Sequence, residues 1–199
     1  MTLDIVRKYL TILWIGYYRL IVITLCSLFV KYKYVLRGAV IKSGFKAYGT
    51  FKMRGWYNNI HLLHQVDIHR NVCLIVGRTG KIQVGNHSSV SYNTVVNAGN
   101  GRILIGEHTM IAGNCYIVAN DHEINKTLSV RDCGHVDGDV VIGNNVWIGA
   151  NCVVTKGVTI GDGAVIGAGS VVVKDIPPMA IAVGSPCKVI KYRKLAPTT

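Results

Sequence analysis

The chain has 199 residues, enough for one domain with a hydrophobic core and a short appendage. Half of the residues are hydrophobic and only 16% are charged, below the usual fraction of about 25%. The formal net charge of +12 suits an anionic partner, such as a nucleotide cofactor or an anionic membrane surface. Nucleic acid is not expected as a partner, because the basic residues are scattered and no aromatic-basic motif is present.

An apolar stretch near the N-terminus runs from Tyr9 to Val30, and its single charged residue is Arg19. A helix of this length would just span a bilayer core of about 30 Å. The aliphatic residues favour insertion, but an arginine near the centre opposes it by roughly 2.5–3.5 kcal/mol. Spanning, re-entrant and interfacial placements therefore stay open, and so does packing on the protein's own body or on a sister subunit. We expect residues 1–37 to form a helical segment that contacts a membrane.

Basic residues after this stretch outnumber those before it. The following flank contains Lys31, Lys33, Arg37 and Lys42, against Arg7 and Lys8 on the other side. The positive-inside rule would place the rest of a spanning chain in the cytoplasm. The expected location is therefore the cytoplasmic side, at the inner face of the cell membrane.

A repeat of six residues organises the second half of the chain. Its aliphatic positions are Ile142, Ile148, Val154, Ile160, Ile166 and Val172. Neither a helix nor a simple strand has this period, whereas hexapeptide repeats are typical of a β-helix. Each hexad would supply one short strand with an inward aliphatic side chain and one tight corner, where glycine permits a positive φ. A β-sandwich is disfavoured because its strand spacing is irregular.

Weaker hexads extend the repeat back towards Gly38, so residues 38–178 are predicted to form the solenoid. Residues 119–139 are polar, off-period and rich in ionisable groups, which indicates a loop ejected from the coils. Two prolines after Ile176 mark the end of the repeat, since proline donates no ladder hydrogen bond. Residues 179–199 are expected to pack back on the last coils.

Three blocks of sequence carry a family resemblance. They are Asp121-His122, then VVIGNNVWIGANCVVTKGVTIGDGAVIGAGSVVVKDIPP, and then AVGSPCKVIK. With these blocks the chain resembles the hexapeptide-repeat acyltransferases, within the O-acetyltransferase branch that includes galactoside, maltose, capsule and lipopolysaccharide acetyltransferases. The resemblance implies an all-β solenoid of the left-handed parallel β-helix type, acetyl-CoA as the acyl donor, a homotrimer and no metal.

The resemblance also implies where the donor binds. In the family, acetyl-CoA lies along a stack of small residues, in a groove between two subunits of the trimer. The matching positions here are Ala150, Ala168, Val173, Lys174, Lys188 and Lys191. Small side chains let the pantetheine lie against the backbone, and lysines suit the phosphates of CoA. The alternative for each lysine is a solvated basic tail, and Trp147 is expected to pack beside the groove.

His122 matches the catalytic histidine of the family. Its role would be to remove the proton of an acceptor hydroxyl, which a side chain with a pKa near 6.5 does well at neutral pH. The alcohol would attack the acetyl carbonyl directly, with a backbone N–H stabilising the oxyanion. Asp121 or Glu123 would orient the imidazole, and His135 is the second candidate base. The alternative is that His122 is a solvated loop residue.

Other polar residues leave alternatives open. His87 and His108 occupy the same place in their hexads and would stack at one corner, either as a polar ladder or as part of a zinc site. The six cysteines include no C-x-x-C pair and no zinc spacing, so we expect no metal. The resemblance places an active-site asparagine near Asn93 or Asn97, without deciding between them.

The sequence predicts an acetyl-CoA-dependent O-acetyltransferase that acts on a sugar or glycan hydroxyl in surface polysaccharide assembly. The apolar N-terminus and the basic surface favour a lipid-linked acceptor. A different acceptor for the same donor, such as an amino sugar, an amino acid or an antibiotic, is one alternative. The other is a non-catalytic solenoid that serves as a docking module.

Overall fold

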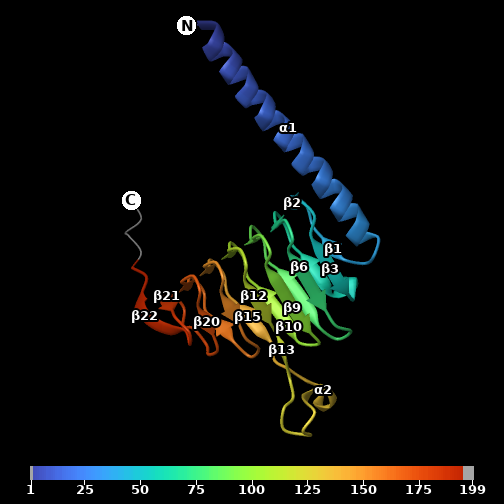
Figure 1. Ribbon diagram of the computed structural model, residues 1–199, viewed down its shortest axis with the longest axis vertical. Helices are drawn as coiled ribbons and strands as arrows, with labels where there is room; N and C mark the ends of the chain where they lie inside the picture. The colour runs from blue at the N-terminus through green and yellow to red at the C-terminus, as the bar shows by residue number, and fades with distance from the viewer. Residues whose placement is uncertain (1, 195–199) are drawn as a thin grey trace.

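The computed structural model describes residues 2–194, with side chains from Tyr18 onward except that of Arg19. The chain forms one long helix followed by a β-solenoid whose coils stack along one axis (Figure 1). The solenoid has three faces, each a sheet, and successive strands of the chain fall on the three sheets in turn. The hexad repeat therefore predicted the architecture correctly.

Sheet A forms the first face. Its strands in spatial order are β1 (Val40–Ile41), β4 (Ile60–Leu62), β7 (Lys81–Val84), β10 (Arg102–Ile105), β15 (Val140–Ile142) and β18 (Thr159–Ile160). Sheet C, which faces the viewer in Figure 1, consists of β3 (Lys52–Gly55), β6 (Cys73–Val76), β9 (Val95–Gly99), β12 (Tyr116–Val118), β17 (Val153–Val154) and β20 (Val171–Val172). A 3₁₀ turn, Tyr57–Asn59, connects β3 to β4.

Sheet B forms the remaining face and closes the end of the stack. It contains β2 (Lys46–Tyr48), β5 (Asp67–His69), β8 (Ser89–Val90), β11 (Met110–Ile111), β16 (Trp147–Ile148), β19 (Val165–Ile166), β21 (Ala180–Val183) and β22 (Lys188–Tyr192). Its coil strands pair in parallel, and β22 turns back antiparallel on β21. The described part of the C-terminal tail thus covers the last coil.

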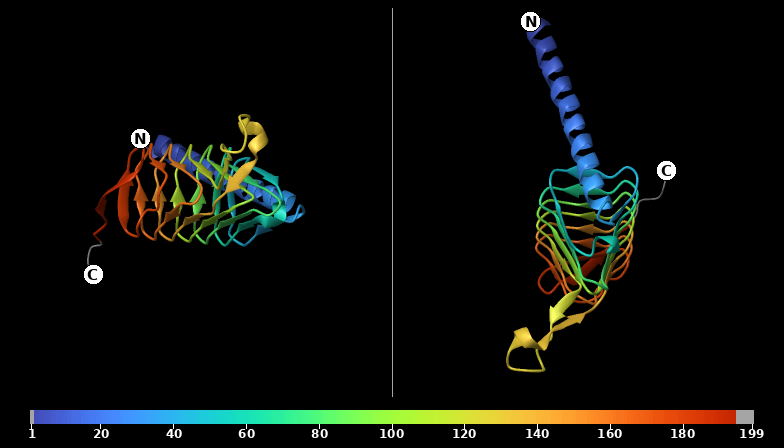
Figure 2. Two further views of the ribbon diagram at one scale, coloured as in Figure 1. Left: turned by 90° about the horizontal axis from the view of Figure 1, so that it is seen from below. Right: turned by 90° about the vertical axis from the view of Figure 1, so that its right-hand side faces the viewer.

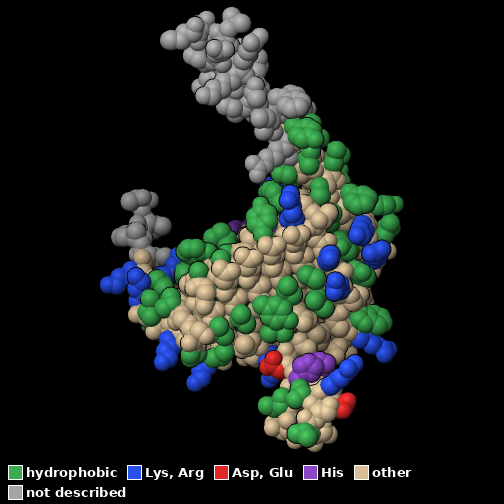
Figure 3. Space-filling model, viewed as in Figure 1, with side chains coloured by type: hydrophobic (Ala, Val, Ile, Leu, Met, Phe, Trp, Pro, Cys, Tyr) green, Lys and Arg blue, Asp and Glu red, His purple; other side chains and the backbone are tan. Residues whose placement is uncertain are grey.

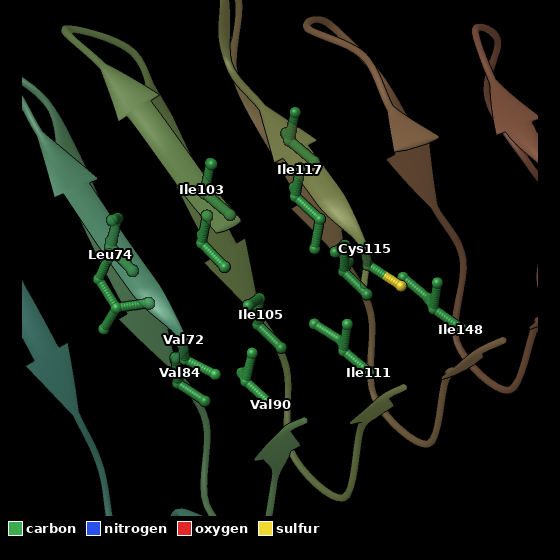
Figure 4. Packing of buried hydrophobic residues seen from close by; sticks show 14 of the residues in the cluster. Val72, Leu74, Val84, Val90, Ile103, Ile105, Ile111, Cys115, Ile117 and Ile148 are labelled. Atoms are coloured by element: carbon green, nitrogen blue, oxygen red, sulfur yellow. The ribbon is translucent and has the colours of Figure 1, made fainter. Parts of the chain in front are cut away.

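The core is a set of aliphatic columns inside the stack. Ile142 pairs with Ile105 on one side and with Ile160 on the other, so equivalent hexad positions lie directly above one another. Ile148 and Ile160 are fully buried, as the repeat predicted. Figure 4 shows such side chains stacked between neighbouring coils. Full burial of one such side chain contributes roughly 1.5–3 kcal/mol, so each coil is stabilised by the next.

The corners between sheets B and C contain an asparagine ladder. Asn93, Asn114 and Asn151 all have a positive φ, which asparagine tolerates better than most residues. The Asn71 Nδ2 donates to Asn93 Oδ1 at 3.1 Å, and Asn93 Nδ2 donates to Asn114 Oδ1 at 3.0 Å. Amide side chains therefore take the place of glycine and link successive coils.

Helix α1 spans Thr2–Val35, and its C-terminal part docks on the first coil. The Ser27 hydroxyl accepts a hydrogen bond from Ala47 N at 2.8 Å, and the Tyr34 hydroxyl donates to Phe51 O at 3.0 Å. The remaining length of α1 projects away from the solenoid (Figures 1 and 2). Within the part of the chain that the structure describes, no helix is both long and apolar enough to cross a membrane. The side chains of residues 9–17 and of Arg19, all in the predicted membrane segment, lie outside the described residues, as do residues 195–199 of the tail.

The predicted ejected loop leaves the solenoid between β12 and β15. It forms an antiparallel hairpin of β13 (Asn120–His122) and β14 (His135–Asp137), with the short helix α2 (Val130–Cys133) at its far end. The Arg102 Nε donates to Asp139 Oδ2 at 2.8 Å, which anchors the returning strand to the preceding coil. That hydrogen bond holds the pKa of Asp139 below its usual range. The loop is therefore an ordered projection, here called the hairpin (residues 120–137).

Candidate active site

His122 lies at the end of β13, where the hairpin leaves the solenoid. Its side chain is exposed and lines a cleft of about 300 Å³. The cleft is lined by Asn97, Tyr116, Val118, Asn120, Asp121, His122 and His135. The histidines gather at the base of the hairpin on the surface (Figure 3). An exposed imidazole beside a cleft can exchange a proton with a bound hydroxyl group.

The second candidate base, His135, is the direct partner of His122. The two residues are opposite one another in the hairpin register, and their ring centroids are 4.4 Å apart with an angle of 36° between the ring planes. The antiparallel pairing brings together two histidines that are far apart in the loop sequence. Both imidazoles line the same cleft, so the structure supplies two neighbouring proton-accepting groups.

The two carboxylates expected to orient His122 make other contacts. The Asp121 carboxylate lies 4.0 Å from Lys156 Nζ, on the following coil. The Glu123 carboxylate accepts hydrogen bonds from Ile124 N at 2.9 Å and Asn125 N at 3.0 Å. The backbone donors, Asn125 first, lower the pKa of Glu123. Among the described residues, neither carboxylate forms a hydrogen bond with His122.

The two asparagines named from the sequence lie at opposite edges of sheet C. Asn97 points outward from β9 and lines the cleft, with its Oδ1 accepting a hydrogen bond from Gly99 N at 3.1 Å. Asn93 lies in the asparagine ladder at the other edge of sheet C. Asn120 adds a buried Oδ1 atom that has no partner in the described structure. Asn97 and Asn120 are therefore the asparagines that line the cleft.

The predicted small-residue stack is present at the corner between sheets B and C. Ala150 O accepts a hydrogen bond from Gly169 N at 2.8 Å, which places Ala150 and Ala168 on adjacent coils. A Cβ atom added to Gly149 would meet Ala168 N at 2.6 Å, so the backbones of the two coils approach closely here. Trp147, on β16 just before this corner, is half exposed on sheet B.

The other predicted donor contacts lie elsewhere on the chain. Val173 and Lys174 follow β20, at the opposite edge of sheet C from the alanines, and both are exposed. Lys188 and Lys191 are on β22, where they pair with Val183 and Ile181. On a single chain, the predicted CoA contacts thus lie in three separate groups.

His87 and His108 stack as the hexad alignment predicted. Their ring centroids are 4.7 Å apart with an angle of 2° between the ring planes, and both residues have a positive φ. Among the described residues, no group of three or more His, Cys, Asp or Glu side chains is arranged to hold a metal ion. The pair lies at the corner that joins sheets A and B, where the two rings stack from one coil to the next.

The sequence interpretation missed Tyr116, Val118 and Lys156. Tyr116 and Val118 flank the buried Ile117, so strand alternation turns both towards the outside. Their position immediately before the ejected loop was the signal that could have identified them as part of the cleft. No pattern in the sequence predicts the contact between Lys156 and Asp121, because it depends on the path of the hairpin.

With this fold and site, the chain belongs to the hexapeptide-repeat transferase family. The family model described as bacterial transferase hexapeptide (six repeats) matches residues 139–174. The fold is the left-handed parallel β-helix of the solved members, as the resemblance implied.

Individual relatives extend the similarity. Galactoside O-acetyltransferase of Escherichia coli (strain K12) is 40% identical over 111 residues, covering 55% of this chain and 53% of the relative. A probable acetyltransferase of Mycobacterium tuberculosis is 32% identical over 140 residues, covering 67% of this chain and 46% of the relative. The chain thus spans about half the length of the curated relatives it matches.

Solved structures give a similar result over more of the chain. A maltose O-acetyltransferase from Clostridium difficile 630 has 32% identity and a TM-score of 0.54, covering 77% of this chain and 71% of that chain. AntD, an N-acyltransferase from Bacillus cereus solved with dTDP and 3-hydroxybutyryl-CoA, has 21% identity and a TM-score of 0.71, covering 82% and 88%. The second likeness concerns the fold alone.

Proposed function

We propose that the protein is an acetyl-CoA-dependent O-acetyltransferase that acts on a sugar hydroxyl, with His122 as the general base. The observation that carries the proposal is the exposed His122 imidazole in a cleft at the point where the hairpin leaves the coils. The names of the relatives, a galactoside and a maltose O-acetyltransferase, support the transfer of an acetyl group to a sugar hydroxyl.

In the proposed reaction, His122 accepts the proton of the acceptor hydroxyl while the oxygen attacks the thioester carbonyl of acetyl-CoA. The C–S bond of the thioester then breaks, which leaves the acetyl group joined to the sugar through the new ester C–O bond. The CoA sulfur then takes the proton from the imidazolium, so the histidine returns to its neutral form. In this proposal, Asn97 and Asn120, which line the cleft, form hydrogen bonds with the sugar.

We infer that acetyl-CoA binds between subunits of a homotrimer, with Ala150, Ala168, Val173, Lys174, Lys188 and Lys191 as its contacts. The separation of these residues on one chain supports the inference, because a groove between two chains can draw its walls from different corners. Light scattering on the purified protein tests it, and a monomer that still binds CoA would contradict it.

The location of the enzyme is part of the proposal. The described part of α1 exposes many large apolar side chains, namely Tyr18, Leu20, Ile21, Val22, Leu25, Leu28, Phe29, Tyr32 and Val35. Lys31 and Lys33 lie on the same helix and Arg37 follows it, which suits an anionic lipid surface. We propose that α1 holds the enzyme at the inner face of the cell membrane, where it modifies a surface polysaccharide precursor.

Sedimentation with phosphatidylglycerol vesicles tests the membrane proposal. The full chain should bind them more strongly than phosphatidylcholine vesicles, and Leu25→Ser/Phe29→Ser should reduce the bound fraction. Leu128→Ser, an exposed leucine on the hairpin, is the matched control. Equal sedimentation of all three proteins would contradict the proposal.

The activity test measures the free thiol released from acetyl-CoA with and without a sugar acceptor. Galactose and maltose are the first acceptors, and the amino sugar dTDP-4-amino-4,6-dideoxyglucose, found with AntD, tests N-acylation. Faster release with a hydroxyl acceptor supports the proposal, and release with the amino sugar alone would favour the N-acyl alternative. Absence of both CoA binding and thiol release would favour the docking module instead.

A further inference from the structure

The outer face of sheet C carries two rows of side chains that cross the strands. The first row is Lys52, Cys73, Val95 and Tyr116, and the second is Arg54, Ile75, Asn97 and Val118. Each row begins with a basic residue on β3 and ends on β12, beside the hairpin. Between these ends, the side chains are short or apolar and half-buried.

One end of this face is the cleft described above. Asn97, Tyr116 and Val118 line it together with His122 and His135. The reacting hydroxyl of the proposed acceptor belongs at this end, because both imidazoles lie here. The rest of the acceptor must therefore extend from the cleft along an adjoining surface.

The other end of the same face is a basic cavity of about 570 Å³. Lys33 from α1 joins Lys52 and Arg54 of β3 in its lining, which includes no acidic residue. Among the described residues, none of these three cations forms an ion pair with a carboxylate. Lys33 contacts the ring of Tyr34, with Nζ 5.2 Å from the centroid. This cavity therefore offers positive charge that no carboxylate among the described residues neutralises through an ion pair.

The two cavities share a strand. Val95 lines the basic cavity and Asn97 lines the cleft, and these residues project from the same side of β9. From β3 to β12 there are three inter-strand spacings, roughly 14 Å in total. Figure 3 shows the histidines at the base of the hairpin and Lys and Arg side chains nearer the base of α1 on the same face. A sugar linked through diphosphate spans this length together with the reach of the lysine and arginine side chains that line the basic cavity.

We propose that the outer face of sheet C binds the acceptor and that Lys33, Lys52 and Arg54 bind a phosphate group on the acceptor sugar. The proposal rests on the proposed acetyl transfer and defines its substrate class as a sugar linked through phosphate or diphosphate. Arginine forms paired hydrogen bonds with phosphate oxygens, and the lysines add compact charges beside it. The apolar middle of the face accommodates the sugar ring.

A comparison of acceptors with and without phosphate tests the proposal on the full chain. Acetyl transfer is measured with galactose and with galactose 1-phosphate, and the ratio of the two kcat/KM values is the readout. The wild type should prefer galactose 1-phosphate. Lys52→Gln/Arg54→Gln should lower the ratio roughly 10- to 100-fold, the usual effect of losing hydrogen bonds to a charged group.

Lys46→Gln is the matched control, because Lys46 is an exposed lysine on β2 of sheet B. This variant should keep the wild-type ratio. A loss of stability alone would change both kcat/KM values together and leave their ratio unchanged. An unchanged ratio in Lys52→Gln/Arg54→Gln, or no preference for galactose 1-phosphate in the wild type, would overturn the proposal.

Calorimetric binding separates this proposal from the acetyl-transfer reaction itself. UDP-galactose should bind to His122→Ala as it does to the wild type, and should bind more weakly to Lys52→Gln/Arg54→Gln. Failure of UDP-galactose to bind while galactose is acetylated would overturn the phosphate site and leave the proposed function intact. Binding without any acetyl transfer would instead contradict the proposed function and support the phosphate site.

The source of the phosphate is decided by two further acceptors. UDP-galactose carries the sugar on a nucleotide, and a prenyl-phosphate galactose in detergent micelles carries it on a lipid. Both share the sugar-phosphate group that the three cations recognise. A higher kcat/KM for one of them identifies the natural carrier, and transfer to neither would overturn the proposal.

Discussion

The coils of residues 140–173 and the hairpin of residues 120–137 are neighbours that differ in side-chain burial. In the coils, an aliphatic side chain such as Ile148 or Ile160 is buried at every sixth position and paired with its equivalent one coil away. In the hairpin, both His122 and His135 are exposed. Repeated burial therefore supplies a rigid frame, and titratable side chains become available where the repeat stops.

The largest expected effect comes from His122→Ala in the hairpin. Loss of the general base should reduce kcat for acetyl transfer by roughly 10²–10⁴-fold. Steady-state assays measure kcat, and thermal unfolding should show an unchanged midpoint because the side chain is exposed. His87→Asn is the control, since asparagine tolerates the positive φ at this corner. Comparable rates for His122→Ala and the wild type would remove His122 from the mechanism.

A matched pair of isoleucines, one in the coils and one in the hairpin, should differ in their contribution to stability. Ile160→Ala should reduce the free energy of unfolding by about 2–5 kcal/mol, because its side chain is fully buried between coils. Ile124→Ala should change it by less than about 0.5 kcal/mol, because Ile124 is 66% exposed on the hairpin. Urea unfolding measures both values, and equal losses would show that the hairpin shares the core of the coils.

The proposed acetyl-CoA contacts on the coils should give a smaller effect. Ala168→Leu should raise the KM for acetyl-CoA by about tenfold, equivalent to about 1.4 kcal/mol, since a larger side chain would keep the pantetheine from the backbone. Thr159→Leu, at an exposed position of sheet A, is the control. Initial rates over a range of acetyl-CoA concentrations measure both. Equal KM values would place the donor elsewhere.

The hydrogen bond between Arg102 and Asp139, which anchors the hairpin, should give the smallest effect on stability, and this effect should depend on pH. The hydrogen bond from Arg102 lowers the pKa of Asp139, so ionised Asp139 stabilises the folded state above its ordinary pKa of about 3.9. This contribution is lost as the pH falls through the lowered folded value. The Asp139→Asn variant lacks this contribution at every pH. The difference in melting temperature between the wild type and Asp139→Asn should therefore be largest near neutral pH and disappear in acid, and a constant difference would exclude this origin.

The sequence predicts the coils better than the hairpin for a physical reason. Ile142 and Ile160 are identified by spacing alone, because one buried side chain per hexad determines the fold. The opposition of His122 and His135 depends on the antiparallel register of the hairpin, which no hexad period describes. His122 itself was found through the family resemblance. The approach of Asp121 to Lys156 and the docking of Tyr34 on Phe51 are long-range contacts that also lack a periodic signal.

The direct pairing of β10 with β15 has an evolutionary consequence. Ile103 lies beside Val140 as though the hairpin were absent, so the coils continue in register around it. Doubling the length of such an excursion costs only about 0.6 kcal/mol in loop-closure entropy. The segment can therefore be lengthened, shortened or exchanged without disturbing the scaffold, and selection can alter acceptor preference there while the donor side remains constant.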